Sequence, residues 1–142
     1  MISLDQIVAE ARSWDGTPFH WQQATKGRGC DCKGLIVGVA RALDLPGATS
    51  IHAAMFAHRN GIVDARLLRE GLEANLDRTD DPRPGHVLLL KLANKAQHLA
   101  ILTELPGRMI HTNNGIRRVQ EVRMGKVWWR QLDSAWAWRG IE

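Results

Sequence analysis

The sequence predicts an α+β domain in which helices come first and a small antiparallel sheet follows. In the first half, apolar residues recur every three or four positions, which is the spacing of amphipathic helices. From residue 86 onward, short apolar runs alternate with turn residues, which is typical of strands joined by hairpins. A polar stretch at residues 77–85, which we expect to be a loop, separates the two halves, and we expect residues 1–142 to form a single domain.

The first helix has a clear beginning and a clear buried face. Ser3 is followed three residues later by Gln6, which predicts a capping box at the helix N-terminus. Ile7, Ala11 and Trp14 then recur at helical spacing and predict the face that packs against the core. The turn residues that follow Trp14 end this helix.

A second helix is predicted to begin at Cys32, after an irregular loop at residues 19–31. Its apolar residues keep helical spacing until a Pro-Gly pair breaks the pattern. Two further helices are expected at residues 50–60 and 63–76. Cys32 therefore lies in the first turn of a helix, directly after a loop that contains glycine.

The second half of the chain is rich in short strands. The predicted strands are residues 86–92, 97–103 and 108–112, followed by the segment 116–122 and the tryptophan-rich tail 127–139. In this tail, Trp136 and Trp138 fall on one face of a strand, and we expect them in the core. Trp128 and Trp129 point to opposite faces if their segment is a strand, which would leave one indole exposed.

The charge balance narrows the classes of partner. The chain carries 19 basic and 15 acidic residues, a net charge of +4, which suits a solvated surface or contact with an anionic polymer. Because the basic residues are scattered along the sequence, we expect no nucleic-acid partner. No apolar run approaches the roughly 18 residues of a membrane helix. The N-terminal segment lacks the features of a secretory signal, so we expect cytoplasmic synthesis and no membrane partner.

Two cysteines, Cys30 and Cys32, are separated by one residue and so cannot staple distant parts of a fold. A zinc site needs about four ligands, and the pair has no counterpart elsewhere, so we expect neither a metal nor another cofactor. The presence of one of these cysteines is therefore better explained by chemical reactivity than by a structural role. The helix N-terminus and the neighbouring Lys33 both favour a thiolate at Cys32, whereas Cys30 lies in the loop, so we favour Cys32 as the nucleophile.

A cysteine hydrolase also needs a base that takes the thiol proton and later protonates the leaving amine. If residues 104–107 form a hairpin loop, Thr103 pairs with Arg108, and His98 and His111 become diagonal neighbours on one face of the sheet. A slip of one residue would separate them. A lone histidine on a strand is more often structural, but in the favoured register one histidine can act while the other orients it.

Together these motifs resemble the NlpC family of cell-wall cysteine peptidases. The family has a Gly-x-Pro-Tyr segment, an Asp-Cys-Ser-Gly nucleophile motif, a histidine that opens a strand, and a second histidine about a dozen residues later. The Gly-Cys-Asp-Cys-x-Gly-Leu segment of this chain resembles the one that occurs in the family branch found in phage tails and gene transfer agents. The matching segments here are residues 14–19 (WDGTPF), 29–36 (GCDCKGLI), 98–102 (HLAIL) and 110–111 (IH).

The resemblance implies a permuted papain-like fold, with the cysteine helix packed on a small antiparallel sheet. It also implies hydrolysis of an amide in peptidoglycan stem peptides, typically the bond between D-glutamate and the diamino acid. By position, it makes Cys32 the nucleophile, His98 the base and His111 the residue that orients the base. The backbone amide of Cys32 would contribute to the oxyanion hole.

The sequence departs from the family pattern in the loop before the nucleophile. The family's tyrosine, whose hydroxyl lies near the oxyanion site, falls at Phe19 or, with a gap of one residue, at His20. His20 can donate a hydrogen bond and Phe19 cannot, so His20 is assigned to substrate binding. Gln22 and Gln23 replace a Gly-Gly pair, which reshapes the expected substrate groove.

A second departure follows the nucleophile, where Lys33 stands in place of the usual serine. In family members that bind a free L-alanine amine, that serine and the preceding aspartate contact the amine, so the resemblance assigns Asp31 to substrate binding. A lysine beside Asp31 would repel an incoming ammonium group. We therefore expect a preference for intact, N-acylated stem peptides over free tripeptides or tetrapeptides.

The sequence thus predicts a cysteine endopeptidase that cleaves peptidoglycan within a phage tail or phage-like particle, with tail proteins as partners. The intact Cys32, His98 and His111 support this hypothesis. The changes at Phe19 and at the Gly-Gly pair instead favour a catalytically relic structural or wall-binding tail component of the same fold. An acyltransferase or amidase and a metal-binding module are the remaining alternatives.

Overall fold

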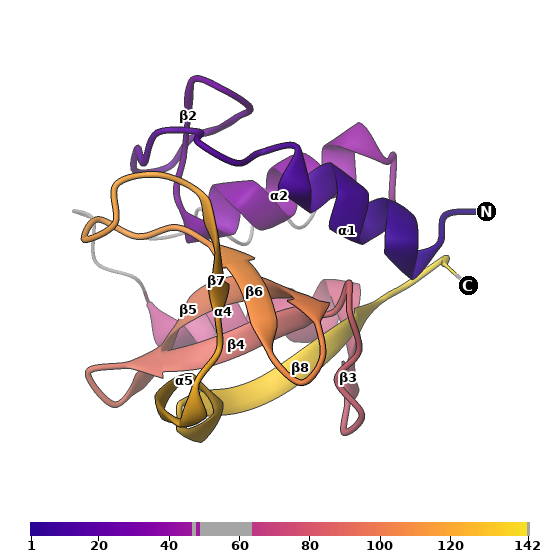
Figure 1. The fold of residues 1–142 in the computed structure, drawn as a ribbon. Coiled ribbons are helices and arrows are strands. Elements are labelled where there is room, and N and C mark those ends of the chain that lie inside the picture. Colours follow the sequence, from indigo (N-terminus) through magenta and orange to yellow (C-terminus); the bar gives the residue numbers. More distant parts are fainter. Residues whose placement is uncertain (47, 49–63, 142) are drawn as a thin grey trace.

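The computed structural model describes residues 1–46, 48 and 64–141, and it confirms the α+β class (Figure 1). The helix expected at residues 50–60 lies outside the described residues. The helices are α1 (Leu4–Arg12), α2 (Cys32–Ala42), α4 (Ala65–Asn75) and α5 (Lys126–Arg130). The strands are β1 (Ala24–Thr25), β2 (Gly29–Cys30), β3 (Leu76–Thr79), β4 (Val87–Leu92), β5 (Lys95–Glu104), β6 (Arg108–His111), β7 (Gln120–Arg123) and β8 (Leu132–Trp138).

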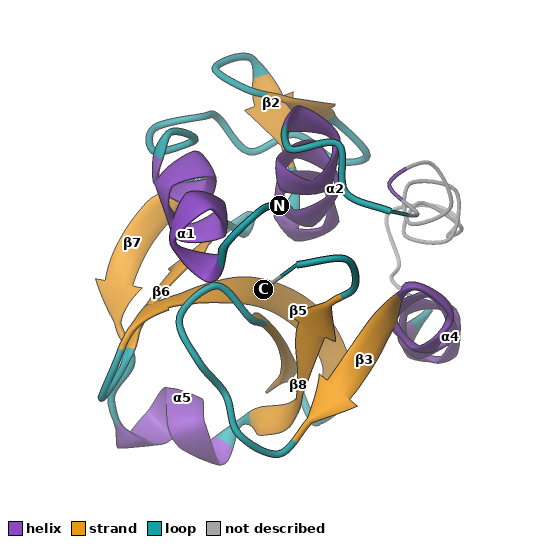
Figure 2. Cartoon of the chain, turned by 90° about the vertical axis from the view of Figure 1, so that its right-hand side faces the viewer, coloured by secondary structure: helices purple, strands orange, loops and turns teal. Residues whose placement is uncertain are grey.

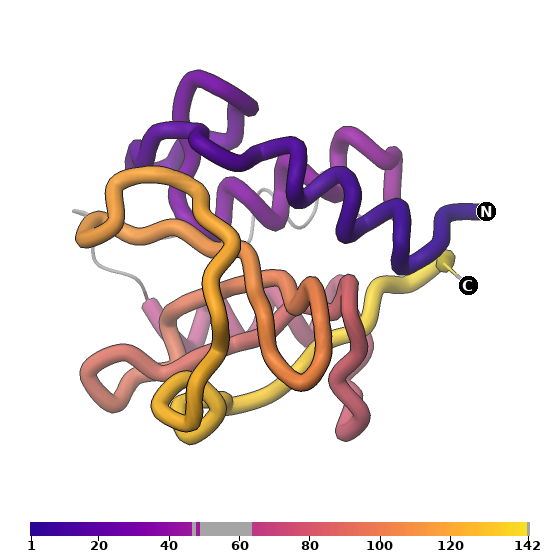
Figure 3. The backbone as a smooth tube through the Cα atoms, in the orientation of Figure 1, coloured from indigo at the N-terminus to yellow at the C-terminus, as the bar shows by residue number. Residues whose placement is uncertain are grey.

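A six-stranded sheet in the order β3-β8-β4-β5-β6-β7 forms the centre of the molecule, and all of its neighbouring strands are antiparallel. Helices α1 and α2 lie on one side of this sheet and α5 lies on the other (Figure 2). The two chain ends lie side by side (Figure 3), and Ile2 forms a parallel bridge with Ile141. This arrangement places the N-terminus of α2 above the central strands.

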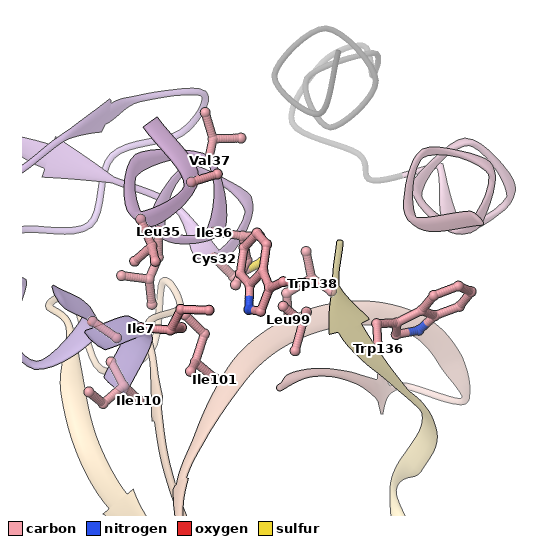
Figure 4. Close-up of a cluster of buried hydrophobic side chains, with 14 of the residues drawn as sticks. Ile7, Cys32, Leu35, Ile36, Val37, Leu99, Ile101, Ile110, Trp136 and Trp138 are labelled. Carbon is pink, nitrogen blue, oxygen red and sulfur yellow. The ribbon is translucent and has the colours of Figure 1, made fainter. Parts of the chain in front are cut away.

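Alternating side chains of β5 fill two separate cores. On the helix side, Leu99 and Ile101 pack with Leu35 of α2 and other fully buried residues (Figure 4). On the opposite side, Ala100 and Leu102 pack in a second cluster that α5 covers. Each fully buried leucine or isoleucine contributes roughly 1.5–3 kcal/mol relative to exposure, so the α2–β5 contact is a major source of stability.

The first helix matches its prediction. The Ser3 hydroxyl accepts from the Gln6 amide at 3.3 Å, while the Gln6 side chain accepts from the Ser3 amide at 2.9 Å. Ile7 and Ala11 are fully buried and Trp14 is almost so. The capping box and the helical face inferred from the sequence are therefore both confirmed.

Helix α2 packs unusually close to its neighbours because it contains glycines at two contact points. A Cβ on Gly38 would overlap the indole of Trp14, so this glycine lets α1 and α2 approach. A Cβ on Gly34 would overlap the backbone carbonyl of Gln23, which lies against the first turn of α2. The predicted irregular loop at 19–31 contains the short β1–β2 hairpin, which turns the chain into α2.

The polar stretch at residues 77–85 is only partly a loop, and that prediction was wrong for its first residues. Leu76–Thr79 form β3, which pairs with β8 at the edge of the sheet, with Leu76 opposite Trp138. Only Leu76 in this strand is buried, because the remaining side chains of an edge strand can stay in water. Because these residues are polar, the sequence pattern does not indicate a strand here.

The tryptophan-rich tail divides into a helix and a strand. Trp128 and Trp129 lie on α5, so the condition that their segment is a strand is not met, and both indoles are half-buried. Trp136 and Trp138 lie on β8 and are 2% and 5% exposed, which confirms their predicted place in the core. Their ring nitrogens are satisfied by Ser134 Oγ at 2.9 Å and the Gly85 carbonyl at 2.8 Å.

Candidate active site

Cys32 is the first residue of α2 and lies against β5. Figure 4 shows it on the side of the helix where Leu99 and Trp138 project. Its side chain is nearly buried, and its sulfur accepts hydrogen bonds from the backbone amides of Leu99 and Lys33. The thiol therefore sits next to the backbone of the residue that follows His98.

The Leu99 amide can reach the thiol because β5 and β6 are not paired at this level. Their ladder runs through Ile101↔Ile110 and Leu102↔Met109, and strand β6 ends at His111. Beyond these pairs the amide of Leu99 donates to Cys32 rather than to β6. The opening between the two strands is where the helix N-terminus meets the sheet.

The two predicted histidines meet in the structure. His98 Nε2 and His111 Nδ1 are 2.8 Å apart, and both side chains are almost completely buried. The predicted register holds for the central pairs of the β5–β6 hairpin. These pairs place both histidines on the same face, as expected.

One detail of that register was wrong. Arg108 pairs with Glu104 instead of Thr103, because the ladder shifts between Leu102 and Glu104. Thr103 is the residue that this shift leaves without a partner on β6. Its hydroxyl donates to Glu121 at 2.7 Å instead. The shift lies beyond the central pairs and leaves the histidines together.

The prediction that His98 is the base gives each of its ring nitrogens a role in this contact. For His98 to accept the thiol proton on Nδ1, its neutral ring must carry a proton on Nε2, which then donates to His111 Nδ1. After the transfer, His98 carries both protons and still donates from Nε2. The same hydrogen bond therefore orients the base before and after proton transfer.

Trp128 of α5 covers this pair. Its ring stacks on His98 with centroids 5.8 Å apart and an interplanar angle of 28°, and it meets His111 edge-on at 5.5 Å. The indole keeps water from the hydrogen bond between the histidines and fixes both rings. The sequence did not reveal this role, since a helix of five residues leaves no period to detect.

Burial controls the protonation of the site. It lowers the pKa of His98 to about 3, with a further contribution from His111, and the pKa of His111 to about 4. Burial also raises the pKa of the Cys32 thiol, although Lys33 and the two amide hydrogen bonds oppose this. The help expected from the helix end and Lys33 is therefore present, but burial outweighs it.

Cys30 has no comparable setting. It is fully buried, and burial, followed by Asp31 and Cys32, raises its pKa to about 12. None of the groups that affect its pKa is a hydrogen-bond donor to its sulfur. Of the two thiols, Cys32 is the one whose sulfur has backbone amide donors, and one of these is Leu99, the residue that follows His98.

Asp31 and Lys33 form a buried charged pair beneath Trp21. The Asp31 carboxylate accepts from the Gly34 amide at 2.7 Å and from the Gln22 amide at 2.9 Å, so it caps α2 and anchors the preceding loop. Lys33 Nζ lies 3.5 Å from Asp31 and 5.8 Å from the centre of the Trp21 ring. Its ammonium group has no hydrogen-bond partner within the described parts of the chain.

This burial corrects the position expected for Lys33. Its side chain is 0% exposed, so it does not stand free beside an incoming ammonium group but offsets the charge of Asp31 from within. Substrate binding by Asp31 stays a prediction. The sequence did not predict that Trp21 would lie over Lys33. Its position two residues after Phe19 was the only indication of a role near the site.

His20, the other predicted substrate-binding residue, is exposed in the loop before Cys32. Its side chain lies against Gly29, and its amide donates to the Cys30 carbonyl at 3.0 Å. The alternative position, Phe19, packs edge-on against Trp21 with centroids 5.0 Å apart. An exposed imidazole near the nucleophile is available to a ligand, and its substrate contact stays a prediction.

Comparison with known sequences identifies the family. Residues 16–136 match the sequence profile of the NlpC/P60 family. The chain belongs to this family. No curated protein matches the chain significantly. Within the described residues, no group of three or more histidine, cysteine or acidic side chains is placed to hold a metal, and no helix is long and apolar enough to cross a membrane.

Solved structures share the fold. The NlpC/P60 domain of the peptidoglycan hydrolase SagA is 22% identical with a TM-score of 0.62, over 96% of this chain and 99% of that domain's chain. NlpC1 from Trichomonas vaginalis is 13% identical with a TM-score of 0.68, over 95% of this chain and 44% of its own. Ly7917, solved with the hydrolysis product of MDP, is 15% identical with a TM-score of 0.64, over 97% and 64%. The papain-like α+β fold expected from the resemblance is confirmed.

The two thiols should differ in reactivity. At about pH 7.5, a limiting amount of iodoacetamide should modify Cys32 at least about tenfold faster than Cys30, because access and thiolate population both control alkylation. Peptide mass mapping over time measures the two rates. Single Cys30→Ala and Cys32→Ala variants confirm the assignment of each peptide, and faster modification of Cys30 would contradict the chosen nucleophile.

The histidine pair should make stability depend on pH. Both native pKa values lie below the value of about 6.5 expected in the unfolded chain. The unfolded chain therefore binds more protons below that pH, and the free energy of unfolding should fall as the pH drops from about 6.5 towards 4. His111→Asn should show a shallower fall in urea unfolding series. His20→Gln, which replaces an exposed histidine, is the control and should keep the original slope; a His111→Asn slope equal to it would refute the assignment.

Proposed function

We propose that this protein is a cysteine endopeptidase that hydrolyses an amide bond in peptidoglycan stem peptides, most specifically the bond between D-glutamate and the diamino acid. The observation that carries the proposal is the buried His98–His111 hydrogen bond beside the nucleophile helix. Membership of the NlpC/P60 family and the fold shared with the SagA peptidoglycan hydrolase domain support it.

The site suggests a defined order of steps. His98 Nδ1 takes the thiol proton as the Cys32 sulfur attacks the scissile carbonyl carbon. The Cys32 amide, which has no intrahelical acceptor at the first helical position, stabilises the oxyanion. The C–N bond breaks as His98 returns its proton to the leaving amine, which yields a thioester. Water, deprotonated by His98, then attacks that thioester and releases the acid and the free thiol.

We further propose that the enzyme acts within a phage tail or phage-like particle that opens the wall locally, with tail proteins as its partners. The Gly-Cys-Asp-Cys-Lys-Gly-Leu segment at residues 29–35 supports this context. A catalytically relic wall-binding component of the same fold is the second candidate. Phe19 favours it, because this residue has no hydroxyl and packs instead on Trp21.

Incubation with purified sacculi should separate these two candidates. The protein should release muropeptides that mass spectrometry identifies, and Cys32→Ala should release none while it keeps its unfolding midpoint. His98→Ala should be nearly as inactive as Cys32→Ala, whereas His111→Asn should retain about 1% of the activity or more, because removing an orienting group costs less than removing the base. Release of no product by the natural sequence would favour the relic, and full activity in both histidine variants would refute the site.

The buried Lys33 should affect which peptide ends are accepted. Because Lys33 offsets the charge of Asp31, the site lacks the net negative charge that attracts a free amine. We expect N-acylated stem peptides to have a kcat/KM about tenfold above that of the matched free-amine peptides, which is a modest effect for charges a few ångströms apart. Lys33→Ser should reduce this ratio of kcat/KM values, because it leaves the negative charge of Asp31 uncompensated.

Lys33→Met is the matched variant, since it removes the charge but keeps most of the side-chain volume. If charge decides, Lys33→Met and Lys33→Ser should shift the preference in the same direction. A shift in Lys33→Ser alone would assign the effect to space rather than charge. Faster turnover of the free-amine peptide by the natural sequence would show that Lys33 does not act this way.

A further inference from the structure

The net positive charge of the chain comes from one segment. Residues 117–130 contain five basic residues and one acidic residue, a net charge of +4. The whole chain has 19 basic and 15 acidic residues, so 14 of each remain outside this segment and cancel. Basic residues occur throughout the sequence, but the entire excess comes from this stretch, here called the basic rim. Its basic residues are Arg117, Arg118, Arg123, Lys126 and Arg130.

The charges of the basic rim are exposed and not neutralised. All five basic residues are exposed, and within the described parts of the chain none of them makes an ion pair. The single acid, Glu121, is already used elsewhere. It accepts from Arg12 and Thr103 and contacts Arg108, and Arg12 above all lowers its pKa to about 2.

Both ends of the basic rim are attached to the active site. At the start, the Phe19 amide donates to the Arg117 carbonyl at 2.8 Å, and Arg118 forms a bridge with Pro18 in the loop that leads to Cys32. At the other end, Trp128 of α5 stacks on His98. Between these points β7 descends to α5 (Figure 1). The segment that carries the charge is therefore joined at both ends to elements of the proposed site.

A hollow lies at the α5 end of the rim. It encloses about 360 Å³ between α5 and the turn that joins β4 to β5, and Lys91, Asn94, Trp128 and Gln131 contribute to its walls. Such a volume is within the range of small-ligand sites, and its walls combine an indole with amide groups and one cation. Trp128 is at once a wall of the hollow and the cover of His98.

We propose that the basic rim and this hollow bind the substrate polymer beside the scissile bond, by pairing with the carboxylates that stem peptides carry along the glycan. This inference rests on the proposed function. Four of the five rim cations are arginines, whose guanidinium groups bind carboxylates in two-point contacts. A row of cations at the edge of the site raises the local concentration of an anionic chain and holds it while one peptide enters.

Binding to sacculi tests this proposal without hydrolysis. In a Cys32→Ala background, co-sedimentation with purified sacculi should weaken about tenfold when Arg123→Gln and Arg130→Gln are combined, because each lost cation reduces attraction to a polyanion. Arg66→Gln combined with Arg78→Gln removes the same charge from α4 and β3 and should bind like the background protein. Equal weakening in the two double variants would overturn the proposal.

Chemically altered sacculi identify the bound group. Amidation of the carboxylates should remove the difference between the rim variant and its control, whereas removal of phosphate polymers should leave that difference. The reverse result would assign the rim to a phosphate polymer, and tighter rim-dependent binding to duplex DNA would assign it to nucleic acid; either overturns the proposal. Because these assays use the Cys32→Ala protein, rim-dependent binding without muropeptide release by the natural sequence would refute only the proposed hydrolysis.

Discussion

The first turn of α2 rests directly on β5, and the rest of the site depends on that contact. The Asp31 carboxylate holds both sides of this junction, since one oxygen caps the helix and the other binds the loop that precedes it. Gly34 allows the loop backbone to lie against the helix, and the Leu99 amide reaches the thiol where the β5–β6 ladder has ended. Removing the Asp31 cap would therefore loosen the nucleophile, the substrate loop and the helix end together.

A second constraint is that Cys32, His98 and His111 are buried away from water. Burial keeps the thiol and both imidazoles neutral at rest, and Trp128 closes the histidines from one side. Among the described residues, the charged groups that act on Cys32 are Asp31 and Lys33, which are opposite in sign and lie 3.5 Å apart. Separating such a buried pair is costly, because either charge alone would lack compensation. In the proposed mechanism, charge therefore develops at this site mainly during the reaction, when the sulfur and His98 exchange a proton.

The sequence predicted those features that depend on local patterns. The capping box of Ser3 and Gln6 was visible because its chemistry is set by spacing alone. The meeting of His98 and His111 was visible because strand pairing alternates with a period of two. The edge strand β3, the shift at Thr103 and the helical Trp128 were not visible. Each of these depends on tertiary contacts that short, polar or aromatic segments do not encode in their periodicity.

The burial of Lys33 was the least expected result, because a lysine is rarely fully buried unless it is paired. Its neighbour Asp31 was read as a substrate ligand, and the pairing of the two became apparent only when the loop was placed over the helix. The reactivity of Cys32 stays a prediction, and the reason given for it was incomplete. Position at a helix N-terminus was inferred from sequence, whereas the desolvation that opposes it arises from the packed sheet.

In the proposed mechanism, the use of a histidine as the orienting group has a consequence for the second half of the reaction. A carboxylate in that position would stabilise the protonated form of the base by direct charge attraction. His111 offers only a lone pair, and burial keeps it neutral. The imidazolium formed on His98 is therefore a stronger acid than it would be beside an aspartate, and it gives up its proton readily. The site favours expulsion of a poor leaving group such as an amine over storage of an ion pair.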